Sequence, residues 1–550
     1  MDAIREWFFS LGGQYGVNPL VFGAIYVGAI PFFMLSIAWL IRNARAKKSV
    51  ARGGGGADSD FDVAVIGGGA AGLTAAGIAA SFGAKTLLVE GARLGGDCTW
   101  TGCIPSKTLL KAAKVAHERR HASHYGLTDV DLPIDSRALM EHVRKVRQEV
   151  YAHADAPALF EAMGIDVRAG RATFVDSHTI AITGANGAEE RVRARFIILA
   201  TGGRPQIPEI AGLDDVPYLT SESVFELEEI PKRILVVGGG PIGCELSQAM
   251  RRLGADVTLV QRGDAILPKD DPELTGMLVR TLETEGVKFF FGAETKRVAR
   301  VANDRDAIRV TLDVHGGERV VVVDAILIAT GRSPNVESLD VAKAGVKLEK
   351  KGIVVDDRCR TNVHHIYACG DVTGRYLLTH VSEHMAKVAA TNVMLKLPTK
   401  IDTRHVPWCT FTDPELAHVG ATEAELTKAK TTFDVYRFPY DKIDRAITDG
   451  ETSGMIKVYA KRATGKILGA SILGASAGDL IGELAVAMRN GVTLRKLADT
   501  IHPYPTLGLG VRRAADQWYV HKRSRRFVRV LQMLFGYRGA LRDFDPNEIV

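Results

Sequence analysis

The sequence predicts an α/β protein that contains two copies of one strand–helix–strand unit and, ahead of them, one transmembrane helix. Three observations predict this fold class. Two glycine-rich motifs each follow a short apolar strand, an uncharged apolar stretch lies near the N-terminus, and Gly makes up 56 of the 550 residues. Glycine clusters at the ends of β-branched strands are typical of α/β nucleotide-binding units.

The overall composition excludes several classes of protein. A chain of 550 residues with 46% hydrophobic and 24% charged residues is neither a single small module nor a disordered polymer. Lys and Arg total 70 against 64 Asp and Glu, and the resulting net charge of +6 does not indicate a nucleic-acid partner. Six cysteines in a chain of this length do not form the framework of a disulfide-stapled secreted fold.

The transmembrane helix is predicted over Leu20–Ile41, inside a segment from Trp7 onward that has no Asp, Glu, Lys or Arg. At about 1.5 Å per residue it reaches roughly 33 Å, enough for a hydrocarbon core of about 30 Å. A cleaved signal peptide is the alternative. The N-terminus carries Asp2, Arg5 and Glu6 instead of a basic segment, which favours a retained helix.

The flanks of this segment predict its orientation. Basic residues follow it without an acid, at Arg42, Arg45, Lys47, Lys48 and Arg52. The positive-inside bias places the catalytic domain in the cytoplasm, at an inner or plasma membrane, with the membrane as a partner. The run Gly53–Gly56 predicts a flexible tether, so residues 1–57 are expected to be an anchor and linker.

The C-terminal tail, residues 516–550, is basic and amphipathic. Apolar residues recur in it at helical spacing, at Phe527, Val530, Leu531, Leu534 and Phe535. A helix on a membrane surface fits this pattern, and so does a helix that docks on its own domain with its arginines solvated. Amphipathicity alone does not separate the two interpretations.

The first repeated unit begins with the strand 61–66, which runs into Gly67-Gly-Gly-Ala-Ala-Gly72 and an Ala-rich helix. In such a motif Gly67 permits the tight turn, Gly69 lets the backbone approach a pyrophosphate, and Gly72 lets helix and strand pack closely. The second strand of the unit ends at Glu90, whose carboxylate is expected to hold a ribose by its hydroxyls.

The second unit follows the first in the same register. Adding 171 to the numbers of Gly67, Gly69, Gly72 and Glu90 gives Gly238, Gly240, Gly243 and Gln261. Two Rossmann-like units predict two bound dinucleotides, and electron transfer between two nucleotide cofactors is the simplest chemistry that they imply.

The end of the second unit predicts which nicotinamide is used. In place of a carboxylate the chain has Gln261, followed by Arg262. This change removes repulsion toward a 2′-phosphate and supplies a cation, so NADPH is expected in preference to NADH. The alternative is that Arg262 is an ordinary surface residue, and Gln261 can still bond a free 2′-hydroxyl.

Two cysteines follow Glu90 closely. Cys98 and Cys103 have four residues between them, in a glycine-rich loop that enters a helix, and they can close a small disulfide ring beside the first dinucleotide. A helix N-terminus favours thiolate, so Cys103 is expected to be a poised anion and Cys98 the outward partner that exchanges with substrate. A zinc site is the alternative, but no second Cys/His pair with ligand spacing is present, and no metal site is predicted. The other cysteines are expected to be small buried residues: Cys244, Cys359, Cys369 and Cys409.

With these motifs the sequence resembles the FAD-dependent pyridine nucleotide-disulfide oxidoreductases, a family that includes mercuric reductase and dihydrolipoamide dehydrogenase. The resemblance covers about residues 61 to 515. It extends to the segments Ile197–Gly203, Ile326–Arg332, Ile366–Asp371 and Phe411–Glu415.

The resemblance implies an α/β fold with two Rossmann-like dinucleotide-binding domains plus an α+β C-terminal interface (dimerisation) domain. The FAD-binding domain would comprise residues 58–205 and 326–400, the NAD(P)-binding domain residues 206–325, and the interface domain residues 401–515. Because Tyr504 would then face the partner's disulfide, a two-fold homodimer is implied.

The same resemblance assigns roles to site residues. Glu90 would contact the adenosine ribose of FAD, Asp371 would lie on the flavin side, and Cys103 would lie against the isoalloxazine. Lys107 and Glu245 would form an ion pair near flavin N5, where a cation favours reduced flavin and a carboxylate offsets the cost of a buried lysine. An ordinary surface pair is the alternative.

The chain departs from the family at its acid–base residues. Disulfide reductases of the family have a His-Pro-Thr segment and a nearby Glu, and aligning Pro505-Thr506 with that segment puts Tyr504 and Leu509 at the two positions. A phenol with a pKa near ~10 is a poor proton shuttle at neutral pH, so efficient turnover of lipoamide or glutathione is not expected. His502 can take over only if it swings inward, and a packing or capping role is its alternative.

The predicted function is a membrane-tethered NAD(P)H oxidoreductase that passes electrons through FAD to the Cys98–Cys103 disulfide and on to a disulfide, metal ion or small redox acceptor. Two alternatives are a flavoprotein that reduces quinone or a membrane redox protein, and a non-catalytic nucleotide-sensing module. Mercuric reductases also have Tyr at the position of Tyr504, but the chain lacks their C-terminal Cys pair, so the resemblance does not identify mercury as the acceptor.

Overall fold

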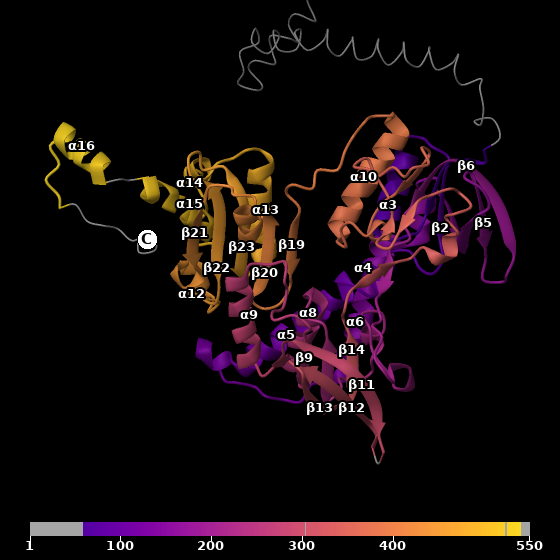
Figure 1. The fold of residues 1–550 in the computed structure, drawn as a ribbon, viewed down its shortest axis with the longest axis horizontal. Coiled ribbons are helices and arrows are strands. Elements are labelled where there is room, and N and C mark those ends of the chain that lie inside the picture. Colours follow the sequence, from indigo (N-terminus) through magenta and orange to yellow (C-terminus); the bar gives the residue numbers. More distant parts are fainter. Residues whose placement is uncertain (1–58, 303, 523–524, 541–550) are drawn as a thin grey trace, which may run out of the picture. The chain divides into compact units, whose positions relative to one another are not determined.

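The computed structural model describes residues 59–302, 304–522 and 525–540, and the elements below all belong to the unit Phe61–Val550 (Figure 1). Three main sheets organise this unit. Two of them contain the repeated strand–helix–strand units, and the third is antiparallel. The α/β class predicted from the sequence is therefore confirmed.

The first repeated unit lies in a seven-stranded sheet of order β3-β2-β1-β6-β5-β4, in which β18 also pairs with β6. Its strands are β1 (Phe61–Ile66), β2 (Thr86–Glu90), β3 (Asp166–Ala169), β4 (Arg171–Phe174), β5 (Thr179–Thr183), β6 (Glu189–Leu199) and β18 (Ile366–Ala368). The pairs of β1 with β2, β2 with β3, β1 with β6 and β18 with β6 are parallel, whereas β4, β5 and β6 pair antiparallel. The pairing of β18 with β6 joins two distant segments of the chain into one sheet.

The same two segments of the chain also contain helices. They are α3 (Ala70–Ser81), α4 (Gly96–Trp100), α5 (Cys103–Arg120), α6 (Ser136–Val150), α7 (Pro157–Glu161) and α10 (Thr379–Leu395). Figure 1 shows α3 and α10 side by side, and buried alanines of both helices belong to one apolar cluster. The small alanine side chains let the two helix axes approach closely.

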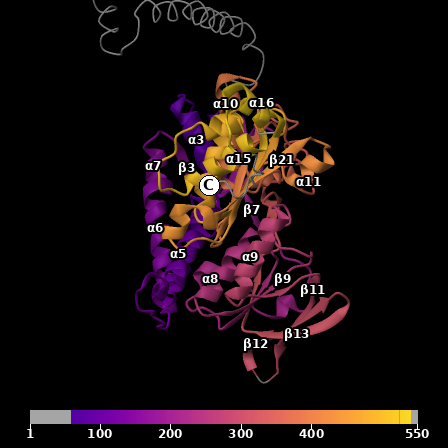
Figure 2. The same cartoon turned by 90° about the vertical axis from the view of Figure 1, so that its left-hand side faces the viewer.

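The second repeated unit forms a parallel sheet of order β10-β9-β8-β14, beside a separate antiparallel sheet (Figure 2). The parallel sheet and its helices are β8 (Arg233–Val237), α8 (Pro241–Arg252), β9 (Asp256–Val260), α9 (Pro272–Thr284), β10 (Lys288–Phe290) and β14 (Ala325–Ile328). The antiparallel sheet contains β11 (Ala293–Val301), β12 (Asp304–Val314) and β13 (Gly317–Val323). Adding 171 to the bounds of α3 gives the bounds of α8, which confirms the common register.

Two short antiparallel sheets of two strands each complete the nucleotide-binding part. β7 (Gly203–Pro205) pairs with β15 (Arg332–Pro334), and β16 (Leu348–Glu349) pairs with β17 (Gly352–Ile353). The first of these sheets brings the end of the predicted segment Ile197–Gly203 next to the end of the segment Ile326–Arg332.

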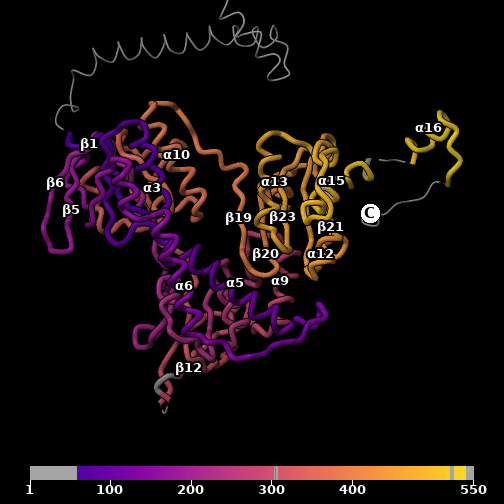
Figure 3. The backbone as a smooth tube through the Cα atoms, turned by 180° about the vertical axis from the view of Figure 1, so that it is seen from behind, coloured from indigo at the N-terminus to yellow at the C-terminus, as the bar shows by residue number. Residues whose placement is uncertain are grey.

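The C-terminal sheet is antiparallel, with the order β19-β20-β23-β22-β21 (Figure 3). Its elements are β19 (Pro407–Thr410), β20 (Glu415–Gly420), α11 (Glu423–Lys428), β21 (Phe433–Pro439), α12 (Asp444–Thr448), β22 (Met455–Lys461), β23 (Ile467–Gly474), α13 (Ala477–Arg489), α14 (Leu494–Ala498) and α15 (Gly508–Lys522). Apolar residues of α13 and α15 pack with residues of this sheet in one buried cluster. This is the α+β domain that the family resemblance implies.

The prediction of a membrane protein needs correction. Within the ranges that the structure describes, no helix is both long enough and apolar enough to cross a bilayer. The longest of these helices is α5, with 18 residues, and its sequence includes six charged side chains. The predicted span Leu20–Ile41 lies outside the described residues. The transmembrane part of the fold class is therefore not supported, and the assignment to an inner or plasma membrane is withdrawn.

The tail forms the amphipathic helix α16 (Arg525–Phe535). None of its described residues is buried. The interpretation of this helix as one docked on its own domain stays a prediction.

A buried lysine joins the second nucleotide unit to the C-terminal sheet. The side chain of Lys457 in β22 is 2% exposed, and its Nζ lies 2.6 Å from Oδ2 of Asp271 and 2.9 Å from Oε2 of Glu273. Asp271 also caps α9 by accepting from the backbone N–H of Leu274, and it accepts a hydrogen bond from Tyr459. Burial by itself lowers the pKa of Lys457, but hydrogen bonds to Asp271 and Glu273 raise this pKa above its usual value. The ammonium therefore stays charged.

We expect Lys457→Ala to destabilise the protein by roughly 3 kcal/mol, because the buried Asp271 carboxylate would lose its cation. The measurement is urea unfolding at pH 7. Arg404→Ala is the control, since Arg404 is 79% exposed where it pairs with Asp402, and a change of about 1 kcal/mol or less is expected there. Equal unfolding midpoints for Lys457→Ala and the wild type would contradict this account.

Candidate active site

The two predicted redox cysteines lie together at one wall of a large cleft. Cys98 lies in α4 and Cys103 begins α5, and Gly102 between them lets the turn close, since a Cβ there would lie 2.8 Å from the carbonyl oxygen of Asp97. The cleft has a volume of about 1570 Å³. It is also lined by residues of both nucleotide units and of the C-terminal domain, among them Gly69, Glu90, Glu245, Asp371 and Phe411.

The two thiols are electrostatically unequal. A hydrogen bond with Cys103, together with burial, raises the pKa of Cys98 well above its usual value. The hydrogen bond from Cys98 lowers the pKa of Cys103 to about 6, against the opposing effect of burial. Cys103 is therefore the thiolate of the pair at neutral pH, as the sequence predicts. The principal cause, however, is the neighbouring thiol, which the argument from the helix N-terminus did not include.

Of the other cysteines, Cys244, Cys359 and Cys369 are buried, as expected. Cys409 is half-buried and lines the cleft, so the expectation of burial is wrong for this residue. It lies in β19, which is an edge strand of the C-terminal sheet. Burial nevertheless raises its pKa, so Cys409 remains a neutral thiol at pH 7.

The implied ion pair between Lys107 and Glu245 is present, with Nζ 2.8 Å from Oε2. The Glu245 side chain is only 6% exposed, so this is not an ordinary surface pair. Its other oxygen accepts a hydrogen bond from the backbone N–H of Phe411 at 2.8 Å, and the Lys107 ammonium lies 4.4 Å from the centroid of the Phe411 ring. The helix of the cysteines, the helix of the second nucleotide unit and the C-terminal domain therefore meet at this pair.

The first nucleotide site has the geometry expected of a phosphate cradle. Gly67 has φ +106°, and a Cβ at Gly72 would lie 1.7 Å from the carbonyl oxygen of Gly67. A Cβ at Gly69 would meet no atom nearer than 3.8 Å, so protein packing does not require this glycine. The open space at the N-terminus of α3 therefore fits a bound pyrophosphate. The Glu90 carboxylate is oriented by the backbone N–H groups of Gly68 at 2.6 Å and Ala92 at 2.7 Å.

The second nucleotide site repeats this geometry. Gly238 has φ +114°, a Cβ at Gly243 would lie 1.9 Å from the carbonyl oxygen of Gly238, and a Cβ at Gly240 would meet nothing within 4 Å. Gln261 takes the place of Glu90: its Oε1 accepts from the N–H of Gly239 at 3.0 Å. Its amide nitrogen donates to the carbonyl oxygen of Ala265, and Arg262 beside it is exposed.

Arg332 is a site residue to which the sequence analysis gave no role, although it ends one of the quoted segments. Its guanidinium contacts the Asp97 carboxylate, lies 3.2 Å from Oδ2 of Asp371 and donates to the carbonyl oxygen of Gly203 at 2.6 Å. Burial raises the pKa of Asp371, and Arg332 opposes this effect. The arginine thus ties α4, the helix that contains Cys98, to Asp371 and Gly203.

A second missed group is centred on Asp413, in the segment Phe411–Glu415. Its carboxylate bonds Arg252 of α8 at 2.7 Å and Lys114 of α5 at 3.1 Å. Arg252, whose side chain is 6% exposed, also pairs with Glu285 at 2.7 Å. This network fixes the two helices that carry Glu245 and Lys107.

Tyr504 and His502, the predicted acid–base candidates, do not share a face. Tyr504 is 69% exposed, and a hydrogen bond to Asp444 raises the pKa of its phenol. The His502 side chain is 8% exposed, with Nε2 2.8 Å from Oε1 of Glu483 and Nδ1 3.0 Å from the carbonyl oxygen of Thr500. His502 is therefore held inside its own subunit.

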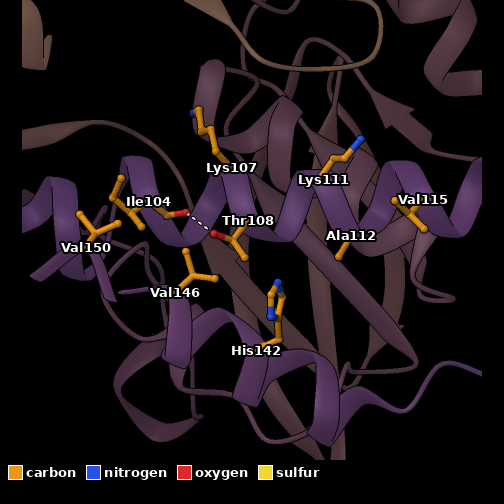
Figure 4. A pocket seen from close by; sticks show the side chains of 9 residues that line it. All are labelled: Ile104, Lys107, Thr108, Lys111, Ala112, Val115, His142, Val146 and Val150. Carbon is orange, nitrogen blue, oxygen red and sulfur yellow. Dashed lines mark hydrogen bonds between the residues drawn. The ribbon is translucent and has the colours of Figure 1, made fainter. Parts of the chain in front are cut away.

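A groove of about 600 Å³ lies between α5 and α6, beside the redox pair (Figure 4). Its lining residues are Ile104, Lys107, Thr108, Lys111, Ala112, Val115, His142, Val146 and Val150. Figure 4 shows Lys107 and Lys111 on α5, with His142 and Val146 on α6 pointing toward that helix. A mostly apolar groove with basic side chains thus begins at Ile104, the residue after Cys103.

Comparison with known proteins places the chain among flavin-dependent reductases. Residues 61–386 match the family described as pyridine nucleotide-disulphide oxidoreductase, and residues 406–515 match its dimerisation domain. A mercuric reductase of Staphylococcus aureus is 35% identical over 463 residues, which are 83% of this chain and 82% of the relative. A dihydrolipoyl dehydrogenase of Bacillus subtilis is 36% identical over 460 residues, which are 83% of this chain and 96% of the relative.

Solved structures agree with this assignment. The crystal structure of LpdA from Mycobacterium tuberculosis has a TM-score of 0.77 at 30% identity, and the match covers 83% of this chain and 99% of that one. A Cu(II) complex of the HOCl-induced flavoprotein disulfide reductase RclA from Escherichia coli has a TM-score of 0.74 at 26% identity, with 83% and 99% covered.

We expect the Cys103 thiolate of the reduced protein to form with a midpoint near pH 6, because its pKa is lowered to about that value. Below this pH the sulfur is protonated and reacts slowly with iodoacetamide. Cys98→Ala removes the hydrogen bond that lowers the pKa most, so the midpoint should rise toward 9.0, the value of an ordinary thiol. The measurement is the pH dependence of Cys103 alkylation, read by peptide mass spectrometry.

Cys409→Ala is the matched control, because the Cys409 thiol has no hydrogen bond to the pair among the contacts of the described residues. It should leave the midpoint unchanged. An unchanged midpoint in Cys98→Ala would show that Cys98 does not polarise Cys103.

Proposed function

The chain belongs to the pyridine nucleotide-disulphide oxidoreductase family, and on this basis we propose that it carries electrons from NADPH, in preference to NADH, to the Cys98–Cys103 pair. From there the electrons pass to a disulfide, a metal ion or a small redox acceptor. The enzyme class is an FAD-dependent NAD(P)H disulfide oxidoreductase, and the family forms homodimers through its dimerisation domain. The proposal concerns the preferred nicotinamide, the residues that act and the acceptor.

The observation that carries the proposal is the polarised thiol pair. Cys103 is a thiolate at neutral pH while Cys98 keeps its proton, and both line the cleft that contains the two nucleotide cradles. A structural pair of buried cysteines would not need a lysine–glutamate ion pair beside it. The arrangement supports two-electron chemistry at sulfur.

The residues of the first unit would hold FAD. Gly67, Gly69 and Gly72 shape the cradle for the pyrophosphate, Glu90 presents its carboxylate to the ribose, and Asp371 lines the same cleft. FAD supplies, when bound, the two-electron chemistry that connects a nicotinamide to a disulfide. The Lys107 ammonium, fixed by Glu245, would provide positive charge where negative charge accumulates.

The residues of the second unit would hold the nicotinamide nucleotide. Gly238, Gly240 and Gly243 repeat the cradle, and Gln261 and Arg262 lie where the ribose of the adenosine half is read in this fold. Gln261 is neutral and tied to the backbone, and Arg262 is exposed beside it. A 2′-phosphate would meet a cation and no carboxylate, which supports NADPH.

The sulfur chemistry with a disulfide acceptor needs both cysteines. Cys98 gives up its proton and attacks one acceptor sulfur, which breaks the acceptor's S–S bond and releases the first thiol. The Cys103 thiolate then attacks the Cys98 sulfur, so the Cys98–Cys103 bond forms and the second thiol leaves. Two electrons move from the pair to the acceptor. The first departing sulfur takes the proton that Cys98 gives up, and the second leaves as a thiolate that takes its proton from solvent.

Proton supply is where this chain differs from disulfide reductases of its family. We assign the exposed Tyr504 hydroxyl, oriented by Asp444, to hydrogen bonding with an acceptor at the redox pair of the partner subunit. His502 receives a structural role, because Glu483 and Thr500 hold its ring. Ile501 is 95% exposed and Val486 64% exposed in the dimerisation domain, which supports a homodimer that covers this region.

The names of the relatives support two classes of electron acceptor, metal ions and disulfides. A mercuric reductase and a Cu(II) complex of a disulfide reductase point to metal ions, whereas a dihydrolipoyl dehydrogenase points to disulfides. Among the described residues there is no cluster of three or more His, Cys, Asp or Glu side chains that could hold a metal. A metal ion would therefore be a substrate at the cysteines.

We expect Cys98→Ser to lower kcat/KM for NADPH-dependent reduction of a disulfide such as 5,5′-dithiobis(2-nitrobenzoate) by about a hundredfold or more, because the attacking sulfur is gone. Cys409→Ser is the control and should keep the wild-type rate. Reduction of a quinone should be measured with the same variants. Two results together would favour the quinone alternative: the wild-type protein reduces no disulfide or metal ion, and the Cys98→Ser variant still reduces quinone at the full rate.

We expect Gln261→Glu to lower the ratio of kcat/KM for NADPH to that for NADH by about fivefold, since a carboxylate near the 2′-phosphate adds repulsion of roughly 1 kcal/mol. Steady-state kinetics with the two nucleotides measure this ratio. Asp264→Asn, at a nearby exposed position, should leave it unchanged. A ratio unaffected by Gln261→Glu would remove Gln261 from nucleotide selection.

A further inference from the structure

A threonine from a distant part of the chain contacts the redox pair. Oγ1 of Thr379, the first residue of α10, lies 3.4 Å from Sγ of Cys103, which is 276 positions away in the sequence. The hydroxyl is also hydrogen-bonded to the Cys98 thiol. Thr379 is half-buried and lines the cleft, so its hydroxyl lies where the chemistry takes place.

Few groups around Cys103 can donate a hydrogen bond to a thiolate. The side chains that bond its sulfur in the described structure are Cys98 and Thr379. Lys107 acts on Cys103 through its charge, but its ammonium is bonded to Glu245, and the Glu245 carboxylate opposes the thiolate. Asp155 is a further carboxylate nearby, and it raises the pKa of Cys98.

Cys98 and Thr379 cannot both donate a hydrogen bond to the Cys103 sulfur at every stage of the reaction. Once Cys98 is covalently bonded to an acceptor sulfur it has no S–H, so it can no longer donate to Cys103. At that stage Cys103 must remain a thiolate, because it has to attack the Cys98 sulfur and release the acceptor. Thr379 is then the remaining side-chain donor among the described contacts of this sulfur.

We propose that the Thr379 hydroxyl is a catalytic hydrogen-bond donor that keeps Cys103 a thiolate while Cys98 is bonded to the acceptor. The inference rests on the proposed function, since it concerns the second half of the exchange. In that step the Cys103 thiolate attacks Cys98, the Cys98–Cys103 bond forms, and the acceptor sulfur leaves as a thiolate with the electron pair of the broken bond and takes a proton from solvent. The hydroxyl keeps its own proton and only donates a hydrogen bond.

The Cys98→Ala enzyme, loaded with FAD, reproduces the condition in which Cys98 cannot donate. In this background we expect Thr379→Val to raise the pH midpoint of the Cys103 thiolate by about one pH unit, a tenfold effect typical of a hydrogen bond to a charged group. With Cys98 present, Thr379→Val should have a smaller effect, because the thiol of Cys98 still donates. Thr379→Ser keeps a hydroxyl and should restore the midpoint of the Cys98→Ala enzyme.

Two readouts give the midpoint without turnover. One is the pH dependence of Cys103 alkylation by iodoacetamide, read by peptide mass spectrometry. The other is the long-wavelength absorbance of a thiolate in contact with oxidised flavin. Thr108→Val is the matched control. Thr108 lies on α5, the helix that Cys103 begins, and among the described contacts its hydroxyl donates to the carbonyl oxygen of Ile104, at 2.8 Å.

The proposal is overturned if Thr379→Val leaves the midpoint of the Cys98→Ala enzyme unchanged, or if Thr379→Ser shifts it as much as Val does. Thr379→Ala gives the same comparison if the Val variant does not retain FAD. Neither readout needs an acceptor. A midpoint shift in an enzyme that reduces no disulfide, metal ion or small acceptor with NADPH would therefore support the role of Thr379 and refute the proposed function.

Discussion

The site depends on the interactions of one buried group, the carboxylate of Glu245. Both of its oxygens are satisfied, one by the Lys107 ammonium and the other by the backbone N–H of Phe411. A carboxylate so far removed from water is tolerated only when it is paired and hydrogen-bonded. The three groups come from the helix of the redox cysteines, the helix of the second nucleotide unit and the C-terminal domain. One electrostatic requirement therefore aligns the parts that must cooperate in electron transfer.

The two repeated units share one backbone conformation at their glycine-rich turns. Gly72 and Gly243 are required by the protein itself, because a Cβ at either position would overlap a carbonyl oxygen. Gly69 and Gly240 border open space, so the missing side chain leaves room for a ligand. The units differ at the end of their second strands, where Glu90 and Gln261 accept from equivalent backbone N–H groups. In the proposed function the backbone would set the place of the ligand, and the side chain would set the charge that the ligand meets.

Several neighbouring groups make the pKa values of Cys98 and Cys103 differ. The two sulfurs polarise each other, Lys107 adds positive charge, and Glu245 limits that effect. The hydroxyl of Thr379 is an uncharged group 3.4 Å from the Cys103 sulfur, and it is also hydrogen-bonded to the Cys98 thiol. In the proposed reaction this arrangement would separate the two tasks of the pair, since one sulfur would exchange with the acceptor while the other stays charged.

The sequence by itself determined the repeated units, their register, the cysteine pair and the family, because these follow from local backbone geometry and from spacings of a few residues. It also indicated a membrane helix, which the described part of the chain does not contain. Tertiary structure alone decided that Arg332, Asp413 and Thr379 reach the site, that His502 is held by Glu483, and that Cys409 lines the cleft. These residues meet across separations of up to hundreds of positions, and only the packing of the domains brings their side chains within hydrogen-bonding distance.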